Sequence, residues 1–146
     1  MDIEENEKSY KGQCLCGSIK YVVDKIEPKM GHCHCTMCRK FHGAAFATFG
    51  EAKVADFHWI QGQELLKTYT APNDTKRKFC RNCGSSLIFV SSNDSGEVIE
   101  FSLGTLDSEI ETKPDAHIFT AYGAGWHEIT DDLPRYLEDR TSVEKT

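Results

Sequence analysis

Apolar and polar residues alternate along short stretches of this chain, and turn-forming residues separate the stretches. In SIKYVV and the residue that follows it, for example, Ile19, Tyr21 and Val23 alternate against the polar Lys20 and Asp24. A period of two residues is typical of a strand with one face buried. Further short strands, rich in aromatic and β-branched residues, are expected at 44–49, 54–60, 64–70, 86–90 and 97–103.

The spacing of these strands predicts a mainly β fold. Residues 92–96 (SNDSG) are typical of a hairpin turn between the last two strands. Only Leu133–Arg140 has a brief helical pattern, and residues 1–8 are an acidic arm expected to be flexible. At 146 residues, the chain fits one domain with a core of moderate size. We therefore expect a single domain of short antiparallel sheets.

The composition limits which classes of partner and which cellular compartment are expected. The net charge is −6, with 23 acidic and 17 basic residues, which argues against a general nucleic-acid binder. The acidic N-terminus lacks the apolar region of a secretory signal, and no apolar run approaches the roughly 20 residues needed to cross a bilayer. A cytoplasmic protein without a membrane partner is expected. In a reducing compartment, an odd number of cysteines (seven) indicates metal binding rather than disulfides.

The cysteines stand in three motifs. GHCHCTMCRKFHG places three of them within six positions, YKGQCLCG holds a C-x-C pair, and KRKFCRNCGS holds a C-x-x-C pair followed by Gly84. Thiolates at such spacing bind a soft or borderline metal, and zinc is the first candidate. Two side chains of an extended C-x-C pair share one face and can reach one ion.

Spacing alone leaves two partitions open. A zinc-ribbon arrangement would join Cys35 and Cys38 to Cys80 and Cys83. The alternative is a group of four and a local group of three, which uses all seven cysteines at a lower loop-closure cost; the four are Cys14, Cys16, Cys80 and Cys83, and the three are Cys33, Cys35 and Cys38. We favour the second partition. A site with three protein ligands keeps a position open for water or substrate, as catalytic zinc sites do.

The three motifs resemble those of the glutathione-dependent formaldehyde-activating (GFA) family, also called the centromere protein V family. The resemblance rests on GQCLCGSIKYVV, CHCTMCRKFHGAAFATF and FCRNCGSSLIF, and extends to GTLD, PDAHIF and WHEITDDLP. It implies a β-tent, an arrangement of β-sheets pinned by zinc, over residues 9–137, with a tail at 138–146. It also implies two zinc ions: a structural one on Cys14, Cys16, Cys80 and Cys83, and a second, open one on Cys33, Cys35 and Cys38.

The resemblance further implies a reaction: addition of glutathione to formaldehyde to give S-hydroxymethylglutathione, a carbon–sulfur lyase reaction that runs in either direction. Three thiolates weaken the Lewis acidity of zinc, so exchange of a substrate thiol suits this site better than activation of water. The expected partners are a small thiol and a small carbonyl compound. A zinc-water hydrolase of a small imine or adduct, a non-catalytic binding module, and zinc storage or redox sensing remain alternatives. Edge strands permit a homodimer.

Histidines near these motifs are candidate helpers. His117, in PDAHIF, is the candidate for proton transfer. His32 and His34 alternate with the cysteines, so in an extended chain they point away from the metal and pack or support its ligands. Basic residues near the motifs would attract an anionic substrate or form a solvated surface; they are Arg39, Lys40, Arg77, Lys78 and Arg81.

Overall fold

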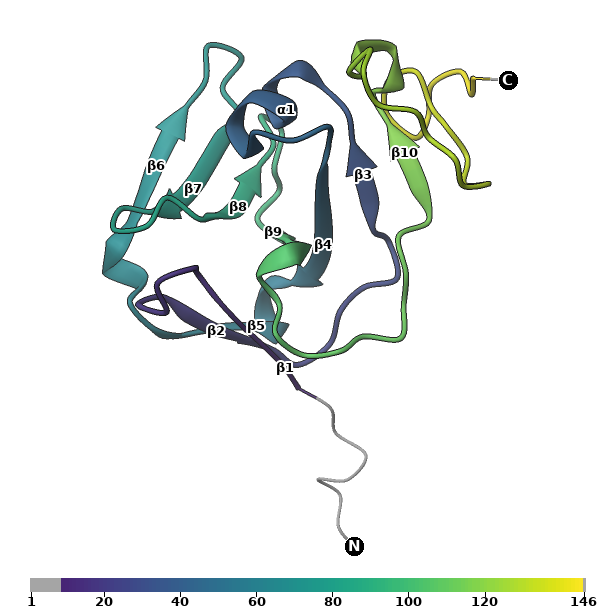
Figure 1. Ribbon diagram of the computed structural model, residues 1–146. Helices are drawn as coiled ribbons and strands as arrows, with labels where there is room; N and C mark the ends of the chain where they lie inside the picture. The colour runs from purple at the N-terminus through teal and green to yellow at the C-terminus, as the bar shows by residue number, and fades with distance from the viewer. Residues whose placement is uncertain (1–8, 146) are drawn as a thin grey trace, which may run out of the picture. The chain divides into compact units, whose positions relative to one another are not determined.

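The structure is a computed structural model that describes residues 9–145 (Figure 1). Its chain forms two compact units. The first unit contains residues 9–28 and 50–111, and the second contains residues 29–49 and 112–145. The arm predicted at residues 1–8 lies outside the described residues. The single, mainly β domain expected from the sequence is confirmed: the described residues contain ten short strands and one α-helix. The predicted domain limits at 9–137 stay a prediction.

The first unit contains two sets of antiparallel strands. In one set β2 lies between β1 and β5, and in the other the order is β9-β8-β7-β6. The bounds are β1 Tyr10–Gln13, β2 Lys20–Val23, β5 Phe57–Gln61, β6 Leu66–Thr70, β7 Lys76–Cys80, β8 Ser86–Val90 and β9 Val98–Ser102. The predicted β8–β9 hairpin is confirmed. β5 and β6 begin later than predicted, because a short 3-10 turn precedes each of them.

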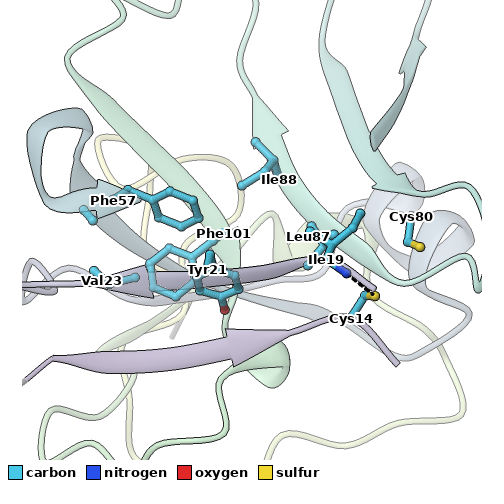
Figure 2. Close-up of a cluster of buried hydrophobic side chains, with 10 residues drawn as sticks. Cys14, Ile19, Tyr21, Val23, Phe57, Cys80, Leu87, Ile88 and Phe101 are labelled. Atoms are coloured by element: carbon cyan, nitrogen blue, oxygen red, sulfur yellow. Dashed lines mark hydrogen bonds between the residues drawn. The ribbon is translucent and has the colours of Figure 1, made fainter. Parts of the chain in front are cut away.

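The alternating residues of β2 place their side chains in the core of this unit (Figure 2). The Tyr21 ring stacks on Phe57 with centroids 4.9 Å apart, and it packs at a tilt against Phe101 at 5.8 Å. The Tyr21 hydroxyl lies 2.7 Å from the Thr105 Oγ1 atom, so the buried polar group has a partner. Burial raises the pKa of Tyr21 well above its usual value. The buried Cys14 and Cys80 belong to the same cluster, which brings two cysteine motifs to the edge of the core.

Gly62 lies just before β6, where the chain passes close to the backbone of Ser18 and Ile19. Its φ of 81° is left-handed, and a Cβ at this position would collide with the carbonyl oxygen of Ser18 and lie 2.9 Å from the Ile19 Cα atom. Because both obstacles are backbone atoms, Gly62→Ala is expected to cost about 2–4 kcal/mol of unfolding free energy through strain and overpacking. Urea unfolding measures this. Gly96→Ala is the matched control: its φ is 83°, but its Cβ would meet nothing within 4 Å, so a loss of about 1 kcal/mol is expected. Equal losses would contradict the steric argument.

The second unit is built on β3, residues Gly31–Cys33. β3 pairs antiparallel with the first residues of β4 (Ala47–Lys53) and parallel with β10 (Ala116–Ile118). Between β3 and β4 the chain forms α1, Thr36–His42, which ends at Gly43 in a left-handed conformation with φ 60°. The cysteine pattern had not predicted this helix. In the described part of the chain, no helix is long and apolar enough to cross a membrane.

The helical pattern at Leu133–Arg140 was a wrong prediction. This segment contains no helix, and its backbone bonds to β10 and the residues that follow it. The Tyr136 amide donates to the His117 carbonyl oxygen at 2.8 Å, and the Phe119 amide donates to the Glu138 carbonyl oxygen at 2.7 Å. Backbone pairing of an extended chain therefore replaces the expected helix. This pairing satisfies N–H and C=O groups that a single helical turn would leave without hydrogen-bond partners.

Candidate metal centres

Four cysteine sulfurs gather in the first unit. Those of Cys14, Cys16, Cys80 and Cys83 all lie within 4.8 Å of one another, and we call them the quartet. Cys14 and Cys16 lie in a turn after β1 rather than in the extended chain we expected; the Gly17 amide closes this turn on the Cys14 carbonyl oxygen at 3.0 Å. Gly84, at φ 82°, closes the corresponding turn after β7 with a 2.8 Å bond to the Cys80 carbonyl oxygen. Two glycine-dependent turns thus present the four sulfurs.

The quartet fits a tetrahedral metal ion. Zinc–sulfur bonds of about 2.3 Å imply sulfurs about 3.8 Å apart. The Sγ atoms of Cys14 and Cys16 are 3.6 Å apart, and those of Cys16 and Cys80 are 3.9 Å apart, whereas a disulfide needs about 2.05 Å. The Ile19 amide donates to the Cys14 sulfur at 3.3 Å, as Figure 2 shows, and such a bond favours a thiolate. The donor set is that of a closed structural site.

The quartet thiols differ in how readily they lose a proton. Burial raises the pKa of the Cys80 thiol to about 11. Burial also acts to raise that of Cys83, but hydrogen bonds with Ser85 and nearby groups outweigh it and lower the pKa to about 6. The Ser18 hydroxyl, 3.3 Å from the Cys16 sulfur, lowers the pKa of Cys16. The thiols of Cys16 and Cys83 therefore ionise at lower pH than the buried thiol of Cys80.

Three further sulfurs gather at the start of α1 in the second unit. Those of Cys33, Cys35 and Cys38 also lie within 4.8 Å of one another, and we call them the trio. Cys33 ends β3, Cys35 is the N-cap of α1, and Cys38 lies on the buried side of that helix. The Cys38 amide donates to the Cys35 sulfur at 3.2 Å, in the manner of an N-cap. A three-residue strand followed by one capped turn of helix is thus enough to bring the sulfurs together.

The trio can hold three thiolates only with a cation present. Contacts with the sulfurs of Cys35 and Cys38, followed by burial, raise the pKa of the Cys33 thiol far above its usual value. Both Cys33 and Cys38 are buried, so water cannot solvate the charge. A divalent metal ion would remove this repulsion, as bound metals do for coordinating thiols. The groups of four and three are those of the second partition.

Two buried histidines and a half-exposed aspartate form a hydrogen-bonded chain in the second unit, which we call the buried chain. The Nε2 atom of His34 is 2.8 Å from Nδ1 of His117, and Nε2 of His117 is 3.0 Å from a carboxylate oxygen of Asp131. Both histidines are 2% exposed, whereas Asp131 is half-exposed. The hydrogen bond to His117 lowers the pKa of Asp131, and burial together with His117 and His127 lowers that of His34 to about 4. His34 is therefore neutral near pH 7.

His34 also lines a pocket of about 310 Å³ formed by the last third of the chain. Its other lining residues include Thr120, Gly123, His127, Arg135 and Lys145. None of the seven cysteines, all of which the structure describes, lines this pocket. His117 is not among the lining residues, so the histidine predicted for proton transfer reaches the pocket only through His34.

Sequence reasoning did not find this chain of side chains. His34 and His117 are 83 positions apart, and Asp131 is 14 positions further on. They meet because β10 pairs in parallel with β3 and places His117 opposite His32. Two histidines on neighbouring strands give no local signal.

The basic residues near the cysteine motifs have separate roles in the structure. Arg77 is 3% exposed, and its guanidinium lies 4.8 Å from the centre of the Phe89 ring, so it belongs to the interior of the first unit. Arg81 donates to the Glu64 carbonyl oxygen at 2.8 Å. Arg39 and Lys40 lie in the last turn of α1, where positive charge complements the helix dipole. Local structural roles thus account for much of this charge.

Comparison with known proteins matches residues 9–122 to the family described as "Glutathione-dependent formaldehyde-activating enzyme". The chain belongs to the GFA family. The match covers all seven cysteines and both histidines of the buried chain, so the quartet and the trio lie within the matched residues.

Individual relatives agree with this assignment. A Schizosaccharomyces pombe protein, named an uncharacterized lyase, is 32% identical over 84 residues, which is 58% of this chain and 59% of that protein. A Halomonas elongata protein, provisionally named a glutathione-dependent formaldehyde-activating enzyme, is 27% identical over 126 residues, or 82% of this chain and 80% of that protein. A crystal structure of a Rhodobacter sphaeroides protein superposes with a TM-score of 0.57 at 24% identity, covering 69% of this chain and 91% of the other, and supports the fold.

Proposed function

We propose that this GFA protein is a zinc-dependent carbon–sulfur lyase that forms or cleaves the S-hydroxymethyl adduct of a glutathione-like thiol and a small aldehyde. The family match over residues 9–122 carries the proposal, and the trio supplies a place for the chemistry. In the forming direction, the thiol sulfur bonds to the aldehyde carbon and the thiol proton ends on the aldehyde oxygen. No oxidant or reductant is needed.

The residues of the two metal centres have different parts in this proposal. The quartet holds a structural zinc and the trio holds the second one. When bound at the trio, zinc would keep a substrate thiol deprotonated next to the aldehyde. The Cys38 amide, bonded to the Cys35 sulfur at 3.2 Å, stabilises a thiolate at the N-cap of α1.

His117 stays in the proposal as a positioning residue. Its two ring nitrogens are engaged by His34 at 2.8 Å and by Asp131 at 3.0 Å, so neither can contact a substrate directly. Its effect on proton transfer must pass through His34. A cytoplasmic location, a homodimer, and the absence of nucleic-acid and membrane partners remain predictions.

The test is an exchange assay with glutathione and formaldehyde, because these compounds also combine without an enzyme. NMR exchange spectroscopy at equilibrium measures how fast the adduct forms and breaks. The protein with both metals bound is expected to accelerate exchange, and Cys35→Ser is expected to reduce this acceleration by about 100-fold, on the order of 2.7 kcal/mol. Metal analysis should show that this variant loses the second zinc.

The control is Thr36→Ala, which changes an exposed residue next to Cys35 and removes no metal ligand. It should retain both ions and the full exchange rate. If Cys35→Ser keeps two ions, the ligand assignment is wrong. If the wild-type protein leaves the exchange rate unchanged, the lyase proposal is wrong, and an imine or other small adduct becomes the substrate to assay.

A further inference from the structure

β6 has an open edge in the first unit. β7 pairs with one side of β6, which is the last strand of its sheet, and the residues from Lys67 to Thr70 are all exposed. The outer edge of β1, which ends the other sheet of this unit, is instead covered by residues 106–108, where the Asp107 amide donates to the Lys11 carbonyl oxygen at 2.8 Å. An uncovered strand edge can accept a further strand.

The hydrogen bonds of β6 show which of its backbone groups face the open edge. The Arg81 amide donates to the Leu65 carbonyl oxygen at 3.0 Å, and these two residues lie opposite each other just before the β6–β7 ladder. In an antiparallel pair, bonded and non-bonded residue pairs alternate. The N–H and C=O groups of Thr68 and Thr70 therefore point away from β7, and no residue in 9–145 bonds to them.

A pocket of about 520 Å³ is formed by residues of β6 and by residues in and just after β7. Its lining consists of Leu66, Lys67, Phe79 and Arg81. Lys67 lies opposite Phe79 in the β6–β7 register, so their side chains share one face of the sheet. The pocket wall thus combines an aromatic ring with two cations, which suits an apolar side chain that has acidic neighbours.

The surface around this pocket is basic. β6, β7 and the residue after β7 contain no Asp or Glu, although the whole chain has a net charge of −6. Lys67, Lys76 and Arg81 are exposed, and within residues 9–145 none of them pairs with a carboxylate. An acidic partner is therefore attracted to this edge, whereas a second copy of the same basic edge is repelled.

We propose that β6 accepts an extended acidic peptide of another protein as an added strand. An apolar side chain of the peptide occupies the pocket, and its acidic neighbours face Lys67 and Arg81. Thr68 and Thr70 supply the main-chain hydrogen bonds, while the pocket and the cations select the sequence. The inference goes beyond the proposed function, because this edge lies in the first unit and needs neither the trio nor the thiol reaction.

The probe is a synthetic peptide, acetyl-TETFTET-amide, whose phenylalanine and two glutamates share one face of an extended chain. Calorimetric titration of the zinc-loaded protein measures its affinity. It should bind at least about tenfold more tightly than TKTFTKT, in which the charges are reversed. TETATET lacks the aromatic ring and should bind about tenfold more weakly than the probe, because it leaves the pocket unfilled.

Two N-methylated forms of the probe test strand addition itself. One carries methyl groups on the amides of its two central threonines, and the other carries them on the amides of its glutamates and phenylalanine. These two sets of amides lie on opposite edges of an extended chain, and one edge alone can pair with β6. In an antiparallel addition with the phenylalanine at the pocket, the threonine amides bond to β6, so their methylation should abolish binding while the other form binds. The reverse result would indicate a parallel added strand, and equal affinities would overturn strand addition.

Thr68→Pro tests the edge from the side of the protein. It removes an N–H group that points away from β7, so the β6–β7 ladder keeps its hydrogen bonds and peptide binding should be lost. Thr68→Ala keeps the N–H group and should bind like the wild-type protein. Lys67→Gln should weaken the probe about threefold, whereas Lys11→Gln, which removes an exposed lysine of the covered strand β1, should leave the affinity unchanged.

Three results would overturn the proposal. The first is no binding of the probe at about 1 mM, and the second is equal binding of TETFTET and TKTFTKT. The third is a wild-type dimer that Thr68→Pro dissociates in sedimentation velocity, because β6 would then pair with a second copy of the chain. The first two results use the wild-type protein, so they decide the matter even if Thr68→Pro does not fold.

Discussion

Cys80→Ser is expected to unfold the first unit. Cys80 is completely buried, belongs to the hydrophobic core and supplies one of the four quartet sulfurs. Loss of one thiolate from a four-sulfur site removes most of the affinity for the ion, and the binding of structural zinc contributes on the order of 10 kcal/mol to folding in zinc-finger peptides. That value is comparable with the whole stability of a domain of this size. The cooperative thermal transition should disappear, together with the near-ultraviolet circular dichroism of Tyr21.

Chelation provides a second measurement that does not depend on soluble Cys80→Ser protein. A strong zinc chelator added to the wild-type protein should remove the near-ultraviolet signal, and excess zinc should restore it. Cys35→Ser is the matched cysteine substitution: it removes a trio sulfur and should leave this signal intact. A Cys80→Ser protein with two ions and a wild-type melting temperature would show that the quartet is not a structural site.

The sequence predicted those parts of the fold in which burial and periodicity agree. Ile19, Tyr21 and Val23 are each at most 1% exposed, so the alternation of apolar residues reflects the one buried face of β2. The cysteine groups were also predictable, because metal ligands must be close in space and their short spacing brings most of them together. The pairing of Cys14 and Cys16 with Cys80 and Cys83 was less certain, because spacing alone left a zinc ribbon open; loop-closure cost favoured the observed groups and the family resemblance implied them.

The features that the sequence did not predict were missed for physical reasons. α1 is seven residues long and begins at a cysteine N-cap, so it shows neither a full helical period nor a standard capping residue. Leu133–Arg140 has helical propensity, but hydrogen bonds to β10 and its following residues hold it extended. The Asp131–His117–His34 chain depends on the parallel pairing of β3 and β10, which are separated by more than eighty residues. Such pairing cannot be deduced from local pattern.

Phe101→Ala is expected to cause a large loss of stability. Phe101 is fully buried, and its ring centre lies 5.8 Å from that of Tyr21 and 5.9 Å from that of Phe57. Truncation removes the transfer free energy of the ring, leaves a cavity and loses two aromatic contacts, so we expect a loss of about 3–5 kcal/mol. Urea unfolding with both metal sites saturated measures it.

Gly50 offers a test of whether this loss comes from the cavity. A Cβ on Gly50 would lie 2.8 Å from the Phe101 Cζ atom, so Gly50→Ala should destabilise the wild-type protein by about 1–3 kcal/mol through overpacking. In the Phe101→Ala background the ring is gone, and the same methyl group enters the vacated space. The two losses should therefore be non-additive, with a double-mutant coupling of at least about 1 kcal/mol in favour of the pair. Strict additivity would mean that the methyl group at Gly50 still meets packed neighbours: either Leu103, whose Cδ1 atom lies 3.1 Å from the Cβ position, or side chains that have closed the cavity.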